Sequence, residues 1–219
     1  RFAPDAVSDK EKAALRASLG IREDAAVVGF VGRLVEEKGI LDLLNAARQI
    51  VDAVPSAQFL FVGPYDKEKP DALRPDVANI YGLAERCHFV GMRQDMPQMY
   101  SLMDVLVLPS YREGFPRAPM EASAMGVPAV VSDVRGCREA VEHEVNGLRF
   151  PCGDVEALAE SVIALLEDQT RRKAMGGAGR KLAEERFDER LVFARVLDEY
   201  ERLLTEREAS QTKLTEATP

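Results

Sequence analysis

The chain has 219 residues, 46% of them hydrophobic, which is enough to bury a full core and excludes disorder of the whole chain. Its formal net charge of -8 excludes a surface that binds nucleic acid or an anionic membrane over most of the molecule, so any polyanionic partner must be small. The three cysteines show no paired short spacing, which argues against a disulfide framework or a thiolate zinc site and favours a reducing cytoplasm.

The chain begins at Arg1 without an initiator methionine, and we expect it to be part of a longer protein. It has neither the pattern of a secretory signal peptide nor a run of about 18 apolar residues, the length that predicts a membrane-spanning helix. We therefore expect a cytoplasmic protein without a membrane anchor of its own.

Short hydrophobic runs alternate with amphipathic stretches along the first 150 residues. The runs cover residues 27–31, 58–62, 88–90, 105–108 and 129–131. Each run is apolar on both faces, as expected for a parallel strand covered by helices on both sides. The stretch 40–54 has apolar residues at helical spacing between Gly39 and Pro55, and a later helix, which contains Glu121, ends at Gly126. This alternation predicts an α/β fold, a Rossmann-like doubly wound parallel sheet.

The pattern becomes helical after residue 150. Asp154 is the predicted N-cap of an apolar-striped helix that reaches about Glu167. Residues 170–186 are helical in composition but contain Gly176, Gly177 and Gly179. Each glycine costs about 1 kcal/mol relative to alanine in a helix interior, so we expect a break there.

A last helix is predicted to begin at Asp188 and to carry a hydrophobic stripe. The polar residues 206–219 lack periodicity and are predicted to form a disordered tail. The sequence thus predicts one Rossmann-like domain over residues 1–205, with helices at its C-terminal end.

Ligands of an open α/β sheet bind beyond the carboxyl ends of its strands, so residues just after each strand are the first candidates. Gly32 and Arg33 follow the first strand, and Lys38 precedes Gly39 at the start of the next helix. An anion would bind there against helix amides. Arg33 would contact it through its planar guanidinium group and Lys38 through its ammonium group. The alternative is a solvated loop, because two glutamates lie between the basic residues. The glycine spacing differs from G-x-G-x-x-G, which argues against a dehydrogenase.

A proline-rich loop follows the fourth strand. Pro116 and Pro119 are tolerated only near a first helical turn, so the next helix should begin close to them. Glu113 then lies on the loop that leads into this helix. The alternative to a binding role for Glu113 is a salt bridge with a neighbouring arginine, Arg112 or Arg117.

Glu121 lies early in this helix, where its carboxylate either complements the helix dipole or accepts hydrogen bonds from vicinal hydroxyls such as those of a ribose. Asn146 and Gly147 are interpreted as turn residues. His88 and His143 have no visible catalytic or metal partner and are expected to be structural. No D-x-D pair is present, so the sequence does not predict a metal site.

Together these motifs resemble the C-terminal, donor-binding domain of the family 4, or group 1, glycosyltransferases, which have the GT-B fold. The resemblance covers nearly the whole chain, to about residue 204. It rests on an ordered series of motifs: Gly32-Arg33 with Lys38-Gly39, Phe89-Val90-Gly91, residues 104–109, an E-x7-E motif that begins Glu113-Gly114-Phe115-Pro116 and ends at Glu121, Gly126-Val127-Pro128, and Asn146-Gly147.

The resemblance implies that the chain is one half of a GT-B fold and binds a nucleotide-sugar donor, a UDP- or GDP-sugar, as substrate and without a cofactor. Arg33 and Lys38 would hold the donor diphosphate and stabilise the leaving charge. Glu121 would bind the ribose hydroxyls, and Glu113 would bind the donor sugar and serve the reaction. The remaining implied donor-binding positions are Gly32, Gly114, Phe115 and Pro116 near the phosphate or sugar, and Val90 and Arg93 near the base.

Pro116 departs from the family pattern, since many members have a glycine there. Proline has no amide hydrogen, so it cannot donate a hydrogen bond to the donor. The segment 112–117 resembles a subgroup associated with bacterial surface polysaccharide synthesis. That similarity implies a saccharide or lipid-linked acceptor, and a full-length enzyme at the cytoplasmic membrane face.

The family reaction retains the anomeric configuration and needs no metal ion. Its acceptor binds mostly to an N-terminal domain that this chain lacks, so we expect the chain alone to bind nucleotide and to transfer nothing. Without that domain, the hydrophobic stripe of the last helix is expected to be exposed and to favour a dimer. The alternatives are a noncatalytic nucleotide-binding or interaction module, and an epimerase or phosphorylase of GT-B-like fold.

Overall fold

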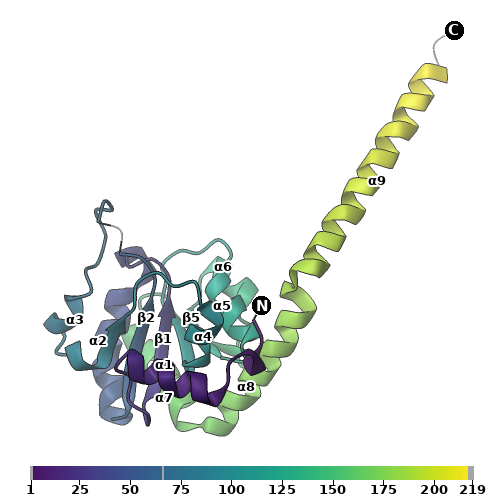
Figure 1. Ribbon diagram of the computed structural model, residues 1–219. Helices are drawn as coiled ribbons and strands as arrows, with labels where there is room; N and C mark the ends of the chain where they lie inside the picture. Colours follow the sequence, from purple (N-terminus) through teal and green to yellow (C-terminus); the bar gives the residue numbers. More distant parts are fainter. Residues whose placement is uncertain (1, 66, 217–219) are drawn as a thin grey trace.

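The computed structural model describes residues 2–65 and 67–216. Six strands form a single parallel sheet in the order β3-β2-β1-β4-β5-β6 (Figure 1). The strands are β1 (Ala26–Val31), β2 (Ala57–Val62), β3 (Cys87–Phe89), β4 (Val105–Leu108), β5 (Ala129–Ser132) and β6 (Gly147–Phe150). The chain builds outward from β1 to β3 and then returns to the other side of β1 with β4. This reversal confirms the doubly wound, Rossmann-like fold.

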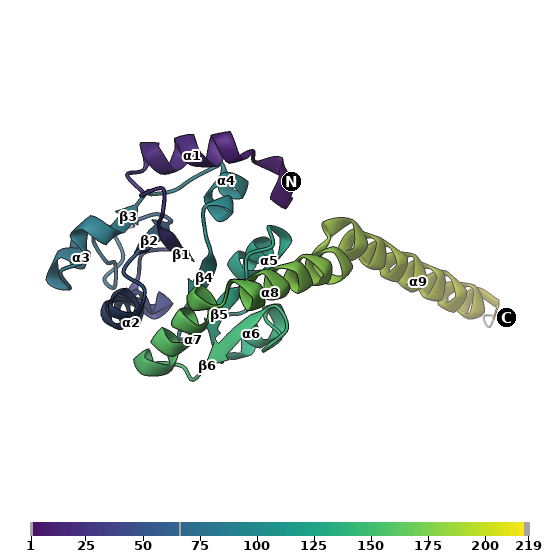
Figure 2. The same cartoon turned by 90° about the horizontal axis from the view of Figure 1, so that it is seen from below.

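Helices cover both faces of the sheet. Figure 2 shows α2 and α7 together on one face, and α1, α4 and α5 on the other. The α-helices are α1 (Asp9–Ser18), α2 (Ile40–Ala53), α3 (Val77–Ile80), α4 (Met96–Ser101), α5 (Arg117–Ala124), α6 (Arg135–Ala140), α7 (Val155–Glu167), α8 (Gln169–Leu182) and α9 (Glu189–Glu216). Short 3-10 turns are η1 (Pro4–Ala6), η2 (Glu36–Lys38) and η3 (Ala84–Arg86), and a π-helical turn is η4 (Ala183–Phe187).

The central strands are buried on both faces, which explains their continuous hydrophobic sequences. All residues of β2, β4 and β5 are buried. In β1 the four inner residues are buried, and Val28 lies opposite Phe59 of β2 and Val105 of β4. The hydrophobic core therefore runs through the sheet and fixes the loops at its carboxyl edge.

The predicted helix boundaries are confirmed where a specific residue defines them. Gly39 precedes α2, and Pro116 is the N-cap of α5. The side chain of Asp154 accepts a hydrogen bond from the Ala157 amide at 3.0 Å, and so caps α7. Asp188 accepts one from the Arg190 amide at 2.9 Å immediately before α9.

The expected break at the glycines of residues 176–179 is wrong, because α8 is continuous through them. A Cβ on Gly176 would lie 2.1 Å from the carbonyl oxygen of Gly126, so glycine is what allows α8 to pack against the end of α5. The low helix propensity of glycine is therefore offset by close helix packing.

The sequence misses a strand, although the turn that it predicts at Asn146 is present. Gly147 begins β6, the edge strand beside β5, and does not lie in an isolated turn. Asn146 is fully buried. It accepts a hydrogen bond from the Glu142 amide at 2.7 Å and donates two from its side-chain amide, to Ser123 Oγ at 3.1 Å and to the Ala140 carbonyl at 3.2 Å. Asn146 thus joins three segments of the fold.

The last helix differs from the prediction in length. Helix α9 begins where expected and projects away from the sheet (Figures 1 and 2). It is helical as far as Glu216, and residues 217–219 lie outside the described residues, so the disordered tail expected over residues 206–219 stays a prediction. Helix-favouring residues and an Arg202–Glu206 ion pair, with an N–O distance of 2.5 Å, support the continuation.

Hydrophobic side chains of α9 are exposed along its first four turns. They are Leu191, Val192, Phe193, Val196, Leu197, Tyr200, Leu203 and Leu204. Within residues 2–65 and 67–216, no helix is long and apolar enough to cross a bilayer.

Candidate functional site

The loops that follow β1 and β4 meet at the carboxyl edge of the sheet, at the point where the strand order reverses. The Tyr111 amide donates a hydrogen bond to the Glu37 carbonyl at 3.0 Å and so joins the two loops. Gly39 has a φ of 70°, and a Cβ there would lie 2.0 Å from the Pro109 carbonyl oxygen. Glycine at position 39 therefore permits both the left-handed backbone conformation and the close approach of α2 to the end of β4. Ligands of doubly wound folds bind at this topological position.

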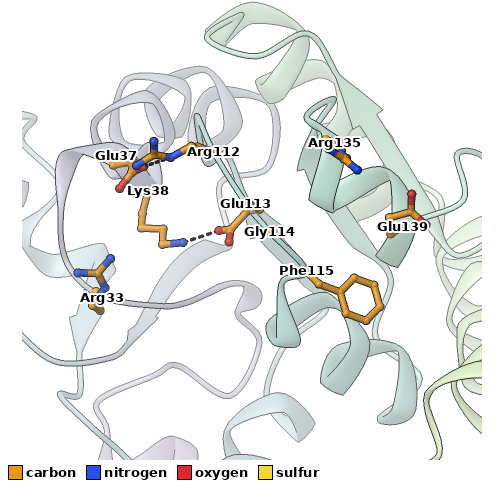
Figure 3. Close-up of a pocket in the computed structure, with 9 residues that line it drawn as sticks. All are labelled: Arg33, Glu37, Lys38, Arg112, Glu113, Gly114, Phe115, Arg135 and Glu139. Atoms are coloured by element: carbon orange, nitrogen blue, oxygen red, sulfur yellow. Dashed lines mark hydrogen bonds and ion pairs between the residues drawn. The ribbon is translucent and has the colours of Figure 1, made fainter. Parts of the chain in front are cut away.

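A pocket of about 800 Å³ opens at this edge (Figure 3). Its walls come from the loops after β1 and β4 and from α6. Its lining residues are Arg33, Glu37, Lys38, Arg112, Glu113, Gly114, Phe115, Arg135 and Glu139. Four basic and three acidic side chains line it, so the pocket has an excess of positive charge in a chain whose net charge is -8.

An ion pair between Lys38 and Glu113 lies at the centre of the pocket (Figure 3). Lys38 Nζ is 2.6 Å from Glu113 Oε1, and the two side chains are only 17% and 11% exposed. The distance and the limited exposure are those of a strong, charge-assisted hydrogen bond. Neither arginine considered as a partner for Glu113 contacts it: Arg112 pairs with Glu37, and Arg117 lies near Glu121.

Cys137 of α6 is fully buried close to this pair. Burial raises the pKa of its thiol to about 12, and the nearby Glu113 carboxylate also raises it. The thiol is therefore neutral at physiological pH and adds no charge to the pocket.

Two cations of the pocket are exposed and have no ion-pair partner among the described residues. They are Arg33, after β1, and Arg135, the first residue of α6. The other two cations are paired, since Arg112 Nε lies 2.9 Å from Glu37 Oε1 and Lys38 binds Glu113. Each of these two arginines can therefore bind an anionic group without first breaking an ion pair.

Phe115 forms the hydrophobic part of the pocket wall. Its side chain is 52% exposed, and its ring meets that of Phe187 edge to face, with ring centroids 6.0 Å apart. Phe187 ends η4, so the C-terminal part of the chain supports the loop that begins at Glu113.

Glu121 does not line the pocket. Its side chain is largely buried, with 19% exposed. Tyr100 donates a hydrogen bond to Glu121 Oε2 at 2.9 Å, and Arg117 Nη2 lies 3.7 Å from Oε1. Burial, with the Glu121 charge as the next cause, raises the pKa of Tyr100 well above its ordinary value. Tyr100 is therefore a neutral donor that fixes the orientation of the Glu121 carboxylate.

The structure brings together Arg33, Lys38, Glu113, Gly114 and Phe115 of the predicted site. The other predicted residues do not line the pocket: Gly32, Val90, Arg93, Pro116 and Glu121. Val90 and Arg93 follow β3 at the far edge of the sheet, and the guanidinium of Arg93 binds Asp95 with an N–O distance of 2.6 Å. Pro116 is buried and is the N-cap of α5.

Four lining residues were missed as site residues: Glu37, Arg112, Arg135 and Glu139. The rule that ligands bind beyond the ends of parallel strands would have found Arg135, which comes three residues after β5. Glu139 lies one helical turn later on the same short helix.

A smaller pocket of about 370 Å³ lies beyond β5 and β6. Its lining residues are Asp133, His143, Arg149, Phe150, Pro151 and Cys152. His143 Nδ1 accepts a hydrogen bond from the Arg149 amide at 2.9 Å, a structural contact as the sequence predicts. No group of three or more possible metal ligands occurs within the described part of the chain.

Comparisons with known proteins agree with the fold. The family model "Glycosyl transferases group 1" matches residues 11–182. The capsular polysaccharide biosynthesis glycosyltransferase CapM of Staphylococcus aureus is 30% identical over 187 residues, 84% of this chain and 48% of that protein.

A second relative is the N,N'-diacetylbacillosaminyl-diphospho-undecaprenol alpha-1,3-N-acetylgalactosaminyltransferase of Campylobacter jejuni. It is 30% identical over 204 residues, 93% of this chain and 52% of that protein. The solved structure of Anabaena HepE in complex with UDP-glucose has a TM-score of 0.83 and 27% identity, and the match covers 92% of this chain and 56% of HepE. The chain spans about half the length of these relatives. These matches show that the chain belongs to the group 1 glycosyltransferase family.

Proposed function

We propose that this chain is the donor-binding half of a glycosyltransferase that moves a sugar from a nucleotide-sugar to a saccharide or lipid-linked acceptor. The observation that carries the proposal is the Lys38–Glu113 pair in a cationic pocket at the topological switch point of a group 1 family fold. HepE, which has the same fold, is solved with UDP-glucose, and the Campylobacter relative is named for a diphospho-undecaprenol acceptor. These names favour a nucleotide-sugar donor and a lipid-linked acceptor.

In the proposed reaction, Arg33 and Lys38 bind the donor diphosphate. Positive charge placed before the reaction stabilises the negative charge that develops on the leaving phosphate. The phosphate and Glu113 compete for the single positive charge of Lys38, whose Nζ lies 2.6 Å from Glu113 Oε1 before the donor binds. Donor binding thereby releases Glu113 to contact the sugar.

Glu121 is proposed to bind the ribose hydroxyls through its second oxygen, since Tyr100 occupies the first. Gly32, Gly114 and Phe115 contact the phosphate or the sugar in this arrangement. Pro116 defines the start of α5 and donates no hydrogen bond. Val90 and Arg93 are proposed to approach the base from the edge of the sheet.

The proposed reaction retains the anomeric configuration and uses no metal ion. Arg33 and Lys38 supply the positive charge that a divalent cation supplies in metal-dependent transferases. The leaving phosphate then accepts the proton of the acceptor hydroxyl. Unchanged transfer in the presence of EDTA supports metal independence, and loss of transfer that Mg²⁺ or Mn²⁺ restores contradicts it.

The acceptor site is proposed to lie on an N-terminal domain outside this chain, because the chain spans about half of its relatives. The chain alone then binds nucleotide and transfers nothing. The longer protein is proposed to work in bacterial surface polysaccharide synthesis at the cytoplasmic face of the membrane. The exposed hydrophobic face of α9 is proposed to pair with a second copy in this isolated chain, which sedimentation velocity over a range of concentrations tests.

Calorimetric titration of the 219-residue chain with UDP, GDP and ADP tests the donor site. We expect measurable binding of UDP or GDP, and circular dichroism should show the helix content of the structure. A folded chain that binds none of the three nucleotides contradicts the proposal.

A further inference from the structure

Arg135 is a cation of the pocket lining to which the proposed function gives no role. It lies on the α6 side of the pocket, whereas Arg33 lies on the other side of the Lys38–Glu113 pair (Figure 3). No ion pair of Arg135 occurs in the described part of the chain, although Glu139 lies four residues later on the same helix. Arg138, also on α6, instead binds Asp133 with an Nε–Oδ1 distance of 2.9 Å.

The backbone that carries Arg135 is fixed relative to Glu113. A Cβ on Gly136 would lie 2.4 Å from the Gly114 carbonyl oxygen and 2.5 Å from that of Glu113. Gly136 and Cys137 are buried. The start of α6 is therefore packed directly against the loop that contains Glu113, while the Arg135 side chain stays exposed to the pocket.

The charges of the pocket indicate what Arg135 binds. The Lys38–Glu113 and Arg112–Glu37 ion pairs each have no net charge. The charged lining residues outside these pairs are Arg33, Arg135 and Glu139. In the proposed function, the diphosphate is bound by Arg33 and Lys38, and Arg135 lies across the Lys38–Glu113 pair from Arg33 (Figure 3). A guanidinium is the group best suited to bind a carboxylate or phosphate through two hydrogen bonds.

We propose that Arg135 binds a second anionic group, distinct from the donor diphosphate, and thereby selects a charged substrate. This inference rests on the proposed function. The second anion is a carboxylate or phosphate carried either by the donor sugar or by the acceptor. A uronic acid donor and a diphosphate-linked acceptor both fit this chemistry, and Arg135 contributes to specificity in either case.

Calorimetry with wild type and Arg135→Gln separates the two sources. For the donor, the probes are UDP-glucose and UDP-glucuronate, or GDP-mannose and GDP-mannuronate if only GDP binds. For the acceptor, the probe is inorganic pyrophosphate added to protein already saturated with the nucleotide. We expect Arg135→Gln to weaken either the uronate donor or pyrophosphate about tenfold, and to leave UDP or GDP binding unchanged.

Arg138→Gln is the matched control, because it removes the same charge from the same helix at a position outside the pocket lining. It should bind every probe as wild type does. The inference is overturned if Arg135→Gln binds the uronate donor as tightly as wild type does and also binds pyrophosphate as tightly. That result leaves the donor site intact. Loss of UDP or GDP binding in Arg135→Gln also overturns it, since Arg135 then belongs to the diphosphate site. Failure of wild type to bind UDP or GDP overturns the proposed function and this inference with it.

Discussion

Lys38 and Glu113 are 75 positions apart in the chain, yet their side chains meet at 2.6 Å across the point where the strand order reverses. Lys38 follows β1, and Glu113 follows β4, the strand beside it. The structure thus joins a phosphate-binding candidate to a sugar-binding candidate in one ion pair. In the proposed reaction, the donor diphosphate and Glu113 compete for Lys38.

Lys38→Met should weaken UDP or GDP binding about tenfold or more, because it removes a charge-assisted hydrogen bond to the diphosphate. Calorimetry measures the change. Lys181→Met is the matched control, since Lys181 is 77% exposed on α8 and outside the pocket. Equal affinities of the two variants would show that Lys38 does not bind the phosphate.

Glu113→Gln and Glu121→Gln should separate nucleotide binding from transfer. Glu113→Gln should bind UDP or GDP no more weakly than wild type, because it removes a competitor for Lys38. Glu121→Gln should weaken nucleotide binding by about tenfold through loss of a ribose contact. In the proposed longer protein that includes an acceptor domain, Glu113→Gln should abolish transfer. Similar losses of nucleotide affinity in both variants would contradict the two roles.

Gly176→Ala should destabilise the fold, whereas Gly177→Ala should be neutral or stabilising by up to about 1 kcal/mol. A Cβ at position 176 would lie 2.1 Å from the Gly126 carbonyl oxygen, but nothing lies within 4 Å of one at position 177. Urea unfolding of the two variants measures the difference. The packing of α8 would be misassigned if both substitutions had the same effect.

Asn146→Ala should lower the free energy of unfolding by about 3 kcal/mol, because it leaves buried backbone and hydroxyl partners without hydrogen bonds. Asn45→Ala is the control, since Asn45 is exposed on α2 and alanine favours the helix. The same unfolding measurement applies. A change below about 1 kcal/mol for Asn146→Ala would mean that water replaces its contacts.

The sequence predicts five of the six strands. Four of them, β1, β2, β4 and β5, are largely buried on both faces and therefore mostly hydrophobic, whereas β3 is a half-buried edge strand. It misses β6, a four-residue edge strand whose third residue is Arg149. It also misjudges Gly176, since local propensity cannot reveal that another segment approaches within contact distance. Local patterns thus predict elements well and their close contacts poorly.

In the candidate site, too, the positions of residues are predictable from the sequence but their contacts are not. Arg33, Lys38 and Glu113 are found because they follow parallel strands, whose ends must converge. The ion pairs of the pocket are not predictable from spacing, because Arg112 is adjacent to Glu113 in sequence but binds Glu37. Arg93, placed near the base by resemblance, lies after the edge strand and pairs with Asp95.

An NMR titration with UDP and GDP tests the central claim most directly, because it reports where nucleotide binds. With ¹⁵N-labelled chain, we expect amide shifts to cluster at Arg33, Lys38 to Gly39, and Glu113 to Phe115, and Lys38→Met to reduce them. A folded spectrum in which these amides do not shift at saturating nucleotide, or in which shifts occur only elsewhere, would contradict a donor site between β1 and β4.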